Sequence, residues 1–277
     1  MNSTTAKRIE KSLPSMTSDA VYFVHRGGSV NGTVVNADAL EFLAAKRSES
    51  ADIVFLDPPF NLGKDYGDKK KVSDRLARTV YEEWLGSILR QSIRILAPGG
   101  TLYFYHIPEW ALRVGHLLNA ALDFKHWIAV SMKNGFVRRE GLYPAHYALL
   151  MYTKGAPAVL RRPKIAPQHC RHCGELLKDY GGYKDIIMNS GINLSDFWDD
   201  LSPVRHGNTK NRLQNELPAL LFKRIIEISG KSGGLYIDPF CGTGSGVLAA
   251  VAGGMRFGAC DILEWNCQIV NFRLSNS

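Results

Sequence analysis

The sequence predicts a doubly wound α/β domain, and two strand-to-turn segments support this fold class. The first is the apolar run at residues 53–56, which ends in the rigid turn Asp-Pro-Pro-Phe at residues 57–60. The second is the apolar run at residues 235–238, which is followed by glycines at 242, 244 and 246 and by small apolar residues at 247–252. A strand, a glycine-rich turn and a helix in this order indicate an open α/β sheet, whose ligands bind at the carboxyl ends of the strands.

The remaining elements follow from apolar periodicity along the chain. Further strands are expected at residues 32–35, 101–105, 127–132, 147–152 and 257–260. Helices are expected at residues 39–45, 80–96, 110–122, 219–228 and 247–252, and a last helix carries Cys267. Residues 1–18 predict a loose polar tail, and residues 156–207, rich in Pro, Gly, His and basic side chains, predict an irregular insertion.

Each residue of the 57–60 turn has a chemical use. Asp57 accepts hydrogen bonds, and Pro58 and Pro59 fix φ and remove two backbone donors, so the carbonyls here face a ligand without a competing N–H. Phe60 offers a flat face on which a base can stack. The turn therefore suits a planar amino group. The alternative is a proline-stiffened loop after a buried strand, which would have the same sequence pattern without binding a ligand.

The glycine-rich segment excludes two common nucleotide sites. Asp238 and Pro239 precede the glycines, so the segment does not match the dinucleotide-binding fingerprint. It also lacks the Gly-Lys-Ser/Thr of a phosphate-binding loop, so a triphosphate is not the expected ligand.

Together the two segments resemble the amino-methylating DNA methyltransferases, which use S-adenosylmethionine. Residues 57–60 resemble the catalytic motif of this family, and residues 238–246 resemble its cofactor-binding motif. The catalytic motif comes first here, by about 180 residues, which is the order of the circularly permuted β group of the family. Residues 34–43, 96–103 and 215–218 extend the resemblance, although Asn-Glu-Leu-Pro at 215–218 departs from the usual His-Pro-Thr-Gln-Lys-Pro.

The resemblance covers roughly residues 30–275 and implies a permuted, Rossmann-like methyltransferase fold. In that fold, residues 19–155 would form the catalytic half and residues 208–277 the cofactor-binding half. Residues 156–207 would form a target-recognition insertion between them, because basic and aromatic side chains alternate there. A solvated insertion without contacts to DNA is the alternative.

The resemblance also implies a site for S-adenosylmethionine at three strand ends. The residues expected to bind the cofactor are Asp38, Asp238, Phe240, Gly242, Gly244, Asp261 and Asn215. Of these, Asp238 and the glycines would hold the methionine and sulfonium part, Asp261 the ribose hydroxyls, and Asp38 the adenine amino group. For an Asp at a strand end, the other common role is a helix N-cap.

The expected reaction is methylation of the exocyclic N6 of adenine in a flipped-out base of double-stranded DNA. Asp57 and the carbonyl of Pro58 would accept the two amino hydrogens and free the nitrogen lone pair, without a covalent enzyme intermediate. Cytosine-N4 methylation is the nearest alternative, because it attacks a similar exocyclic amino group. Most such enzymes carry Ser where this chain has Asp57, so Asp57 favours adenine without excluding cytosine. A nucleic-acid-binding module without catalysis is an alternative of another class. The residues expected to contact DNA are Asn61, Lys64, Lys133, Arg138, Arg139, Arg161 and Arg162.

Composition agrees with this interpretation. The 277-residue chain has a net charge of +8, which favours a polyanionic partner. Five cysteines favour reduced thiols, and the absence of a long apolar stretch predicts a cytoplasmic protein rather than a membrane protein. Cys170 and Cys173 have zinc-knuckle spacing, but no second pair follows, so no bound metal is expected. A partner restriction endonuclease and either a monomer or a homodimer remain open.

Overall fold

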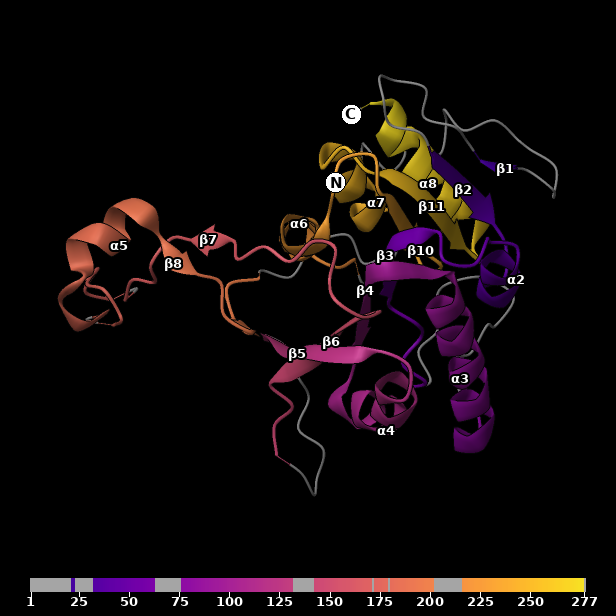
Figure 1. Cartoon of the computed structure of the whole chain (residues 1–277), viewed down its shortest axis with the longest axis horizontal. Helices are drawn as coiled ribbons and strands as arrows, with labels where there is room; N and C mark the ends of the chain where they lie inside the picture. The colour runs from indigo at the N-terminus through magenta and orange to yellow at the C-terminus, as the bar shows by residue number, and fades with distance from the viewer. Residues whose placement is uncertain are drawn as a thin grey trace, which may run out of the picture.

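The computed structural model describes residues 21–22, 32–62, 76–131, 142–170, 172–178, 180–201 and 216–276. Nine strands of these ranges form one central sheet (Figure 1). In spatial order the strands are β1 (Val21–Tyr22), β2 (Gly32–Asn36), β11 (Arg256–Asp261), β10 (Leu235–Asp238), β3 (Ala51–Leu56), β4 (Leu96–His106), β6 (His146–Thr153), β5 (Asp123–Ser131) and β9 (Phe197–Trp198).

The five strands from β2 to β4 run parallel, and β6 is antiparallel to both of its neighbours. Parallel strands are normally covered on both faces, so their sequences are almost continuously apolar. β3 shows this directly, since five of its six residues are buried and Asp52 is half-buried. The strands predicted at 53–56 and 235–238 are therefore neighbours at the centre of the sheet.

Helices cover both faces of the sheet, each with its own apolar core. One face packs against α2 (Ala39–Ala44), α3 (Arg78–Ile95) and α4 (Pro108–Asn119). The other packs against α6 (Ala219–Ser229), α7 (Ser245–Ala252) and α8 (Glu264–Ser275). Alternate residues of β3 serve the two cores: Ile53 and Phe55 face α6, and Val54 and Leu56 face α3. The predicted doubly wound α/β class is confirmed.

Two element boundaries differ from the prediction for a local reason. The helix expected to reach residue 96 ends at Ile95, because Leu96 is extended and begins β4. Gly99 has φ of 75° and donates its N–H to the Lys154 carbonyl at 2.7 Å, just past the end of β6. This bond continues the pairing of β4 with the β6 side of the sheet through the glycine turn at residues 99–100. The strand is consequently longer at its start than the expected 101–105.

The segment predicted as an irregular insertion contains more order than expected. It holds the strand pair β7 (Lys164–Ile165) and β8 (Ile192–Asn193), the 3-10 turn Tyr180–Gly182 and α5 (Lys184–Ser190), and Figure 1 shows this arm extending away from the sheet. The chain then returns to the sheet edge as β9, where Trp198 is buried. No residue of α5 is buried, so its side chains are open to a partner.

Among the described residues, no helix combines the length and apolar character needed to cross a bilayer.

Candidate active site

The proline turn at residues 57–60, predicted to be catalytic, and the glycine-rich turn at residues 238–246 meet at the centre of the sheet. β3 and β10 are adjacent and parallel, with Ile53 opposite Tyr236, so Asp57 and Asp238 lie at the same edge. The helices that follow these two strands cover opposite faces, which makes this edge a switch point and a ligand-binding crevice. The crevice is lined by Phe55, Asp57, Glu216, Leu217, Phe222, Asp238, Phe240, Cys241, Gly242, Thr243 and Ser245.

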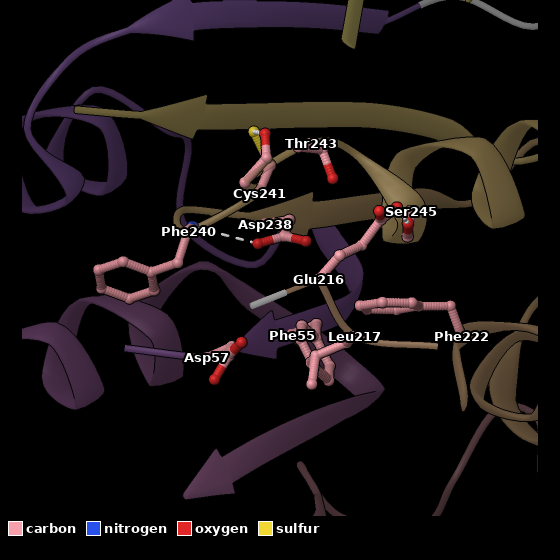
Figure 2. A pocket seen from close by; sticks show the side chains of 11 residues that line it. Phe55, Asp57, Glu216, Leu217, Phe222, Asp238, Phe240, Cys241, Thr243 and Ser245 are labelled. Carbon is pink, nitrogen blue, oxygen red and sulfur yellow. Dashed lines mark hydrogen bonds between the residues drawn. The ribbon is translucent and has the colours of Figure 1, made fainter. Parts of the chain in front are cut away.

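Three carboxylates line this crevice, and no Lys, Arg or His is among its described lining residues. Figure 2 shows the side chain of Asp57, which follows β3, that of Asp238 at the end of the neighbouring β10, and that of Glu216 near Asp238. The charge of the lining suits a ligand that carries a positive group next to an apolar surface.

Asp238 is the most deeply buried of the three acids. Its side chain accepts hydrogen bonds from the Tyr236 hydroxyl at 3.0 Å and the Phe240 N–H at 3.1 Å. Burial raises the pKa of Asp238 to about 7, and the nearby Asp261 acts in the same direction, whereas the two hydrogen bonds lower it. A cation in the crevice would favour the ionised form of this side chain.

The glycines of the turn are required by backbone conformation and close packing. Gly244 has φ of 86° and precedes α7, and a Cβ on it would lie 2.7 Å from Val270. A Cβ on Gly246 would lie 2.3 Å from the hydroxyl of Tyr236, the same hydroxyl that donates to Asp238. The turn, the strand and α7 are therefore packed together behind the crevice.

Asp261 and Asp38 have structural partners in addition to any ligand. Asp261 accepts hydrogen bonds from the Gly242 N–H at 3.0 Å and from the Leu263 N–H and the Asn266 side chain, each at 2.9 Å. Asp38 caps α2, with Oδ1 accepting from the N–H groups of Leu40 and Glu41. Their predicted contacts with the ribose and the adenine remain predictions. Asn215 lies outside the described residues.

Glu216 lines the crevice but is not among the residues predicted from the sequence, which include its neighbour Asn215. Its Oε1 accepts hydrogen bonds from the Ser245 hydroxyl at 2.5 Å and from the Arg273 guanidinium at 2.8 Å. Burial alone would raise the pKa of Glu216, but the bonds from Ser245 and Arg273 outweigh it, so the pKa lies below its ordinary value. The signal available in the sequence was a carboxylate directly before the helix that starts after Pro218.

The catalytic turn is surrounded by aromatic side chains. The ring of Phe60 lies 4.5 Å from that of His106, 5.6 Å from that of Tyr147 and 6.1 Å from that of Tyr105, between ring centroids. Burial, with Asp57 nearby, raises the pKa of both tyrosines, which keeps their hydroxyls protonated. On the opposite side of the turn, the Tyr81 hydroxyl donates a hydrogen bond to the Pro59 carbonyl.

A DNA methylase family model, N6_N4_Mtase, matches residues 51–272, a stretch that contains both turns and every lining residue of the crevice. The chain belongs to this family.

Individual relatives of this DNA methylase agree with the assignment. The chain is 40% identical over 246 residues to the type II methyltransferase M.BamHI of Bacillus amyloliquefaciens, a match that covers 88% of this chain and 57% of M.BamHI. It is 25% identical to the DNA adenine methyltransferase YhdJ of Escherichia coli K12, over 84% of this chain and 79% of YhdJ. The solved PvuII DNA methyltransferase (cytosine-N4-specific) has the same fold, with a TM-score of 0.61 at 13% identity over 89% of this chain and 90% of that one.

Of the seven residues predicted to contact DNA, the structure describes three. Lys64, Lys133, Arg138 and Arg139 lie outside the described residues. Asn61 bonds through its side chain to the backbone N–H and carbonyl of Leu76, and so joins the two ends of the segment between them. Asn61 remains only a predicted DNA contact.

The two arginines at the start of the arm differ in their surroundings. Arg161 donates from its guanidinium to the Gly230 carbonyl at 2.7 Å and, more weakly, to the Glu227 carbonyl at 3.4 Å, at the end of α6. Arg162 is exposed. The predicted DNA contacts of both remain predictions, but Arg161 also ties the arm to α6.

Cys170 and Cys173 lie on a tight turn of the arm, next to the bridge between His169 and Leu176. Within the described ranges, no group of three or more His, Cys, Asp and Glu side chains is arranged to hold a metal ion.

Proposed function

We propose that this methylase transfers a methyl group from S-adenosylmethionine to the exocyclic N6 of adenine in double-stranded DNA. The observation that supports this most is the half-buried Asp57 carboxylate, held by a proline turn at the mouth of the same crevice as Asp238. The carboxylate of Asp57 would bind the amino group, and that of Asp238 would bind the cofactor.

The crevice suits the proposed cofactor in charge. S-adenosylmethionine supplies an electrophilic methyl group on a positively charged sulfur. Three lining carboxylates without a lining base favour that cation, and the burial that raises the pKa of Asp238 would be offset by it. The N-terminus of α7 and the backbone of Gly242 would accommodate the methionine carboxylate. Asp261 would meet the ribose, and Asp38 and Phe240 the adenine.

Asp57 and the Pro58 carbonyl prepare the amino group. The lone pair of an exocyclic amino nitrogen is delocalised into the ring, so the nitrogen is a weak nucleophile. Two acceptors on its two hydrogens would draw it toward tetrahedral geometry and free that pair. An oxygen of Asp57 then accepts the proton that the methylated nitrogen releases. Phe60 would stack on the base, which must leave the duplex to reach this position.

Asp57 is the basis for choosing adenine over cytosine. Cytosine-N4 methylation presents the same kind of amino group to the turn, and the relatives include proteins named for either base. In the family pattern, a carboxylate at this position is typical of adenine enzymes, and a hydroxyl is typical of cytosine enzymes. Because the chain spans only 57% of the length of M.BamHI, activity, DNA site and a partner endonuclease all belong to this proposal.

The test is expression in a host that lacks DNA methylation, followed by long-read mapping of modified bases in host DNA. The proposal predicts N6-methyladenine within one recurrent sequence, absent when Asp57→Ala is expressed instead. N4-methylcytosine would reassign the base. Unmodified DNA, together with DNA binding but no binding of S-adenosylmethionine, would indicate a binding module.

A further inference from the structure

We propose that Tyr81 and His106 are positioning residues that orient the catalytic turn, so that the Pro58 carbonyl, and not the Pro59 carbonyl, meets the amino group of the target base. This inference rests on the proposed function. It starts from two side chains that the resemblance and the sequence motifs left without a role. Tyr81 lies in the first turns of α3, and His106 is the last residue of β4.

The hydrogen bonds run in one direction toward the turn. The Ile107 N–H donates to Nδ1 of His106 at 2.8 Å, so Nδ1 carries no proton. A neutral imidazole then has its proton on Nε2, which lies 2.8 Å from the Tyr81 hydroxyl and donates to it. The hydroxyl proton of Tyr81 is thus directed to the Pro59 carbonyl.

Burial keeps this arrangement in a single protonation state. Tyr81 is 1% exposed and His106 is fully buried. Burial lowers the pKa of His106 to about 3, so the imidazole is neutral at any pH at which an enzyme of this kind works. A neutral imidazole with a backbone N–H on Nδ1 has one tautomer available, and that tautomer donates to Tyr81.

The proline turn needs such an external donor. Pro58 and Pro59 have no N–H groups, so neither residue can anchor the turn by donating a backbone hydrogen bond. The Tyr81 hydroxyl holds the Pro59–Phe60 peptide from outside, while the imidazole of His106 lies against the Phe60 ring at 4.5 Å. One pair of side chains therefore fixes both the carbonyl plane and the stacking ring.

The bond also determines which acceptor the substrate finds. A free Pro59 carbonyl would be a second acceptor within the same rigid turn and would compete for an amino hydrogen. With the hydroxyl of Tyr81 on it, this carbonyl is occupied, and the Pro58 carbonyl is left to act with Asp57. Positioning of this kind affects the chemical step, and Tyr81 is not one of the residues that line the cofactor side of the crevice on β10 and α7.

The experiment compares Tyr81→Phe with Tyr103→Phe. Tyr103 is a matched control, because it is fully buried on β4 and its hydroxyl lies 2.7 Å from the hydroxyl of Ser229, but it faces the other core. Each variant deletes one buried hydroxyl and its hydrogen bonds. We measure kcat for methyl transfer to DNA, the Kd for S-adenosylmethionine and the urea midpoint of unfolding.

Tyr81→Phe is expected to lower kcat about tenfold, the effect of losing one hydrogen bond of ordinary strength from the transition state. Its Kd for S-adenosylmethionine should stay within about twofold of the unmodified protein. Tyr103→Phe should lower the urea midpoint to a similar extent and leave kcat unchanged. Equal falls of kcat in both variants, or an unchanged kcat in Tyr81→Phe, would overturn the proposal.

A second pair of variants tests the direction of the hydrogen bonds. His106→Gln keeps a side-chain donor near the Tyr81 hydroxyl, and His106→Leu removes it. The glutamine variant is expected to retain several-fold more kcat than the leucine variant, and equal kcat values would overturn the assigned role.

If the unmodified protein methylates neither base, the proposed function fails by itself. A crystal structure of Tyr81→Phe then decides the positioning role, which an unmoved Pro59–Phe60 peptide would refute.

Discussion

Replacing Asp238 by Asn should stabilise the protein at high pH and weaken its cofactor site. Burial raises the pKa of this carboxyl from 3.8 to about 7. Between these values the native state holds a proton that the unfolded chain has released, so the free energy of unfolding falls as the pH rises through this window. Above pH 7 the native state must hold a buried charge.

The size of the effect follows from that rise. At 1.36 kcal/mol per pH unit, a rise from 3.8 to about 7 corresponds to a loss of about 4 kcal/mol above pH 7, relative to pH below 4. Asn cannot ionise, so the variant escapes this loss. Its carbonyl can still accept one of the two hydrogen bonds now made by Tyr236 and Phe240, and the Tyr236 hydroxyl can turn to accept from its amide.

The assay is urea unfolding of Asp238→Asn and the unmodified protein at pH 5 and pH 8, without cofactor. The stability of the variant relative to the unmodified protein should increase by about 2–3 kcal/mol between these two pH values. Asp123→Asn, at an exposed position at the start of β5, should show no such increase. The reasoning is wrong if the two variants show the same pH dependence. At pH 8, calorimetry should show weaker binding of S-adenosylmethionine by Asp238→Asn, because this variant lacks the carboxylate proposed to face the sulfonium.

Two further predictions concern packing and the arm. Gly246→Ala should destabilise the protein by about 1–3 kcal/mol and weaken cofactor binding by displacing Tyr236. Gly115→Ala, with open space around the added methyl, should be neutral or stabilising by about 0.5–1 kcal/mol. Urea unfolding measures both stabilities, and equal effects of the two substitutions would contradict the packing argument. Arg162→Ala should reduce the salt dependence of DNA binding by about one phosphate contact, with little change in stability. Arg161→Ala should instead lower the free energy of unfolding by about 1 kcal/mol, because it loses the bond to the Gly230 carbonyl. DNA titrations at several salt concentrations distinguish the two variants, and an equal loss of salt dependence in Arg161→Ala would give that residue a DNA contact as well.

The centre of the fold was predictable because its signals are local. The apolar runs of β3 and β10 mark buried parallel strands, and the residues that end them must meet once the strands are paired. The sequence predicts that Asp57 and Asp238 each follow or end a buried strand, and the pairing of β3 with β10 brings them to one crevice. For Asp38 and Asp261, the sequence left a cap and a ligand contact as alternatives, and both side chains do bond to nearby backbone N–H groups.

Other parts of the site depend on contacts between segments that are distant in sequence. Nothing near Tyr81 or His106 in the chain indicates that the Tyr81 hydroxyl bonds to both the Pro59 carbonyl and His106. These bonds depend on the order of β3 and β4 and on the placement of α3. The same holds for the ion pair between Glu216 and Arg273. β9 is only two residues long, too short for a periodic signal, so its return to the sheet edge was not predicted.

Methyl transfer by Asp57→Ala, measured together with its Kd for S-adenosylmethionine, tests the central claim most directly. Asp57 lies on the catalytic turn, and Asp238, Gly242 and Thr243 form the other wall of the crevice. We predict that transfer of labelled methyl groups to DNA becomes undetectable while the Kd for the cofactor stays within about threefold of the unmodified protein, since the proposed cofactor contacts lie on that other wall. Transfer at the unmodified rate would contradict the role assigned to this carboxylate.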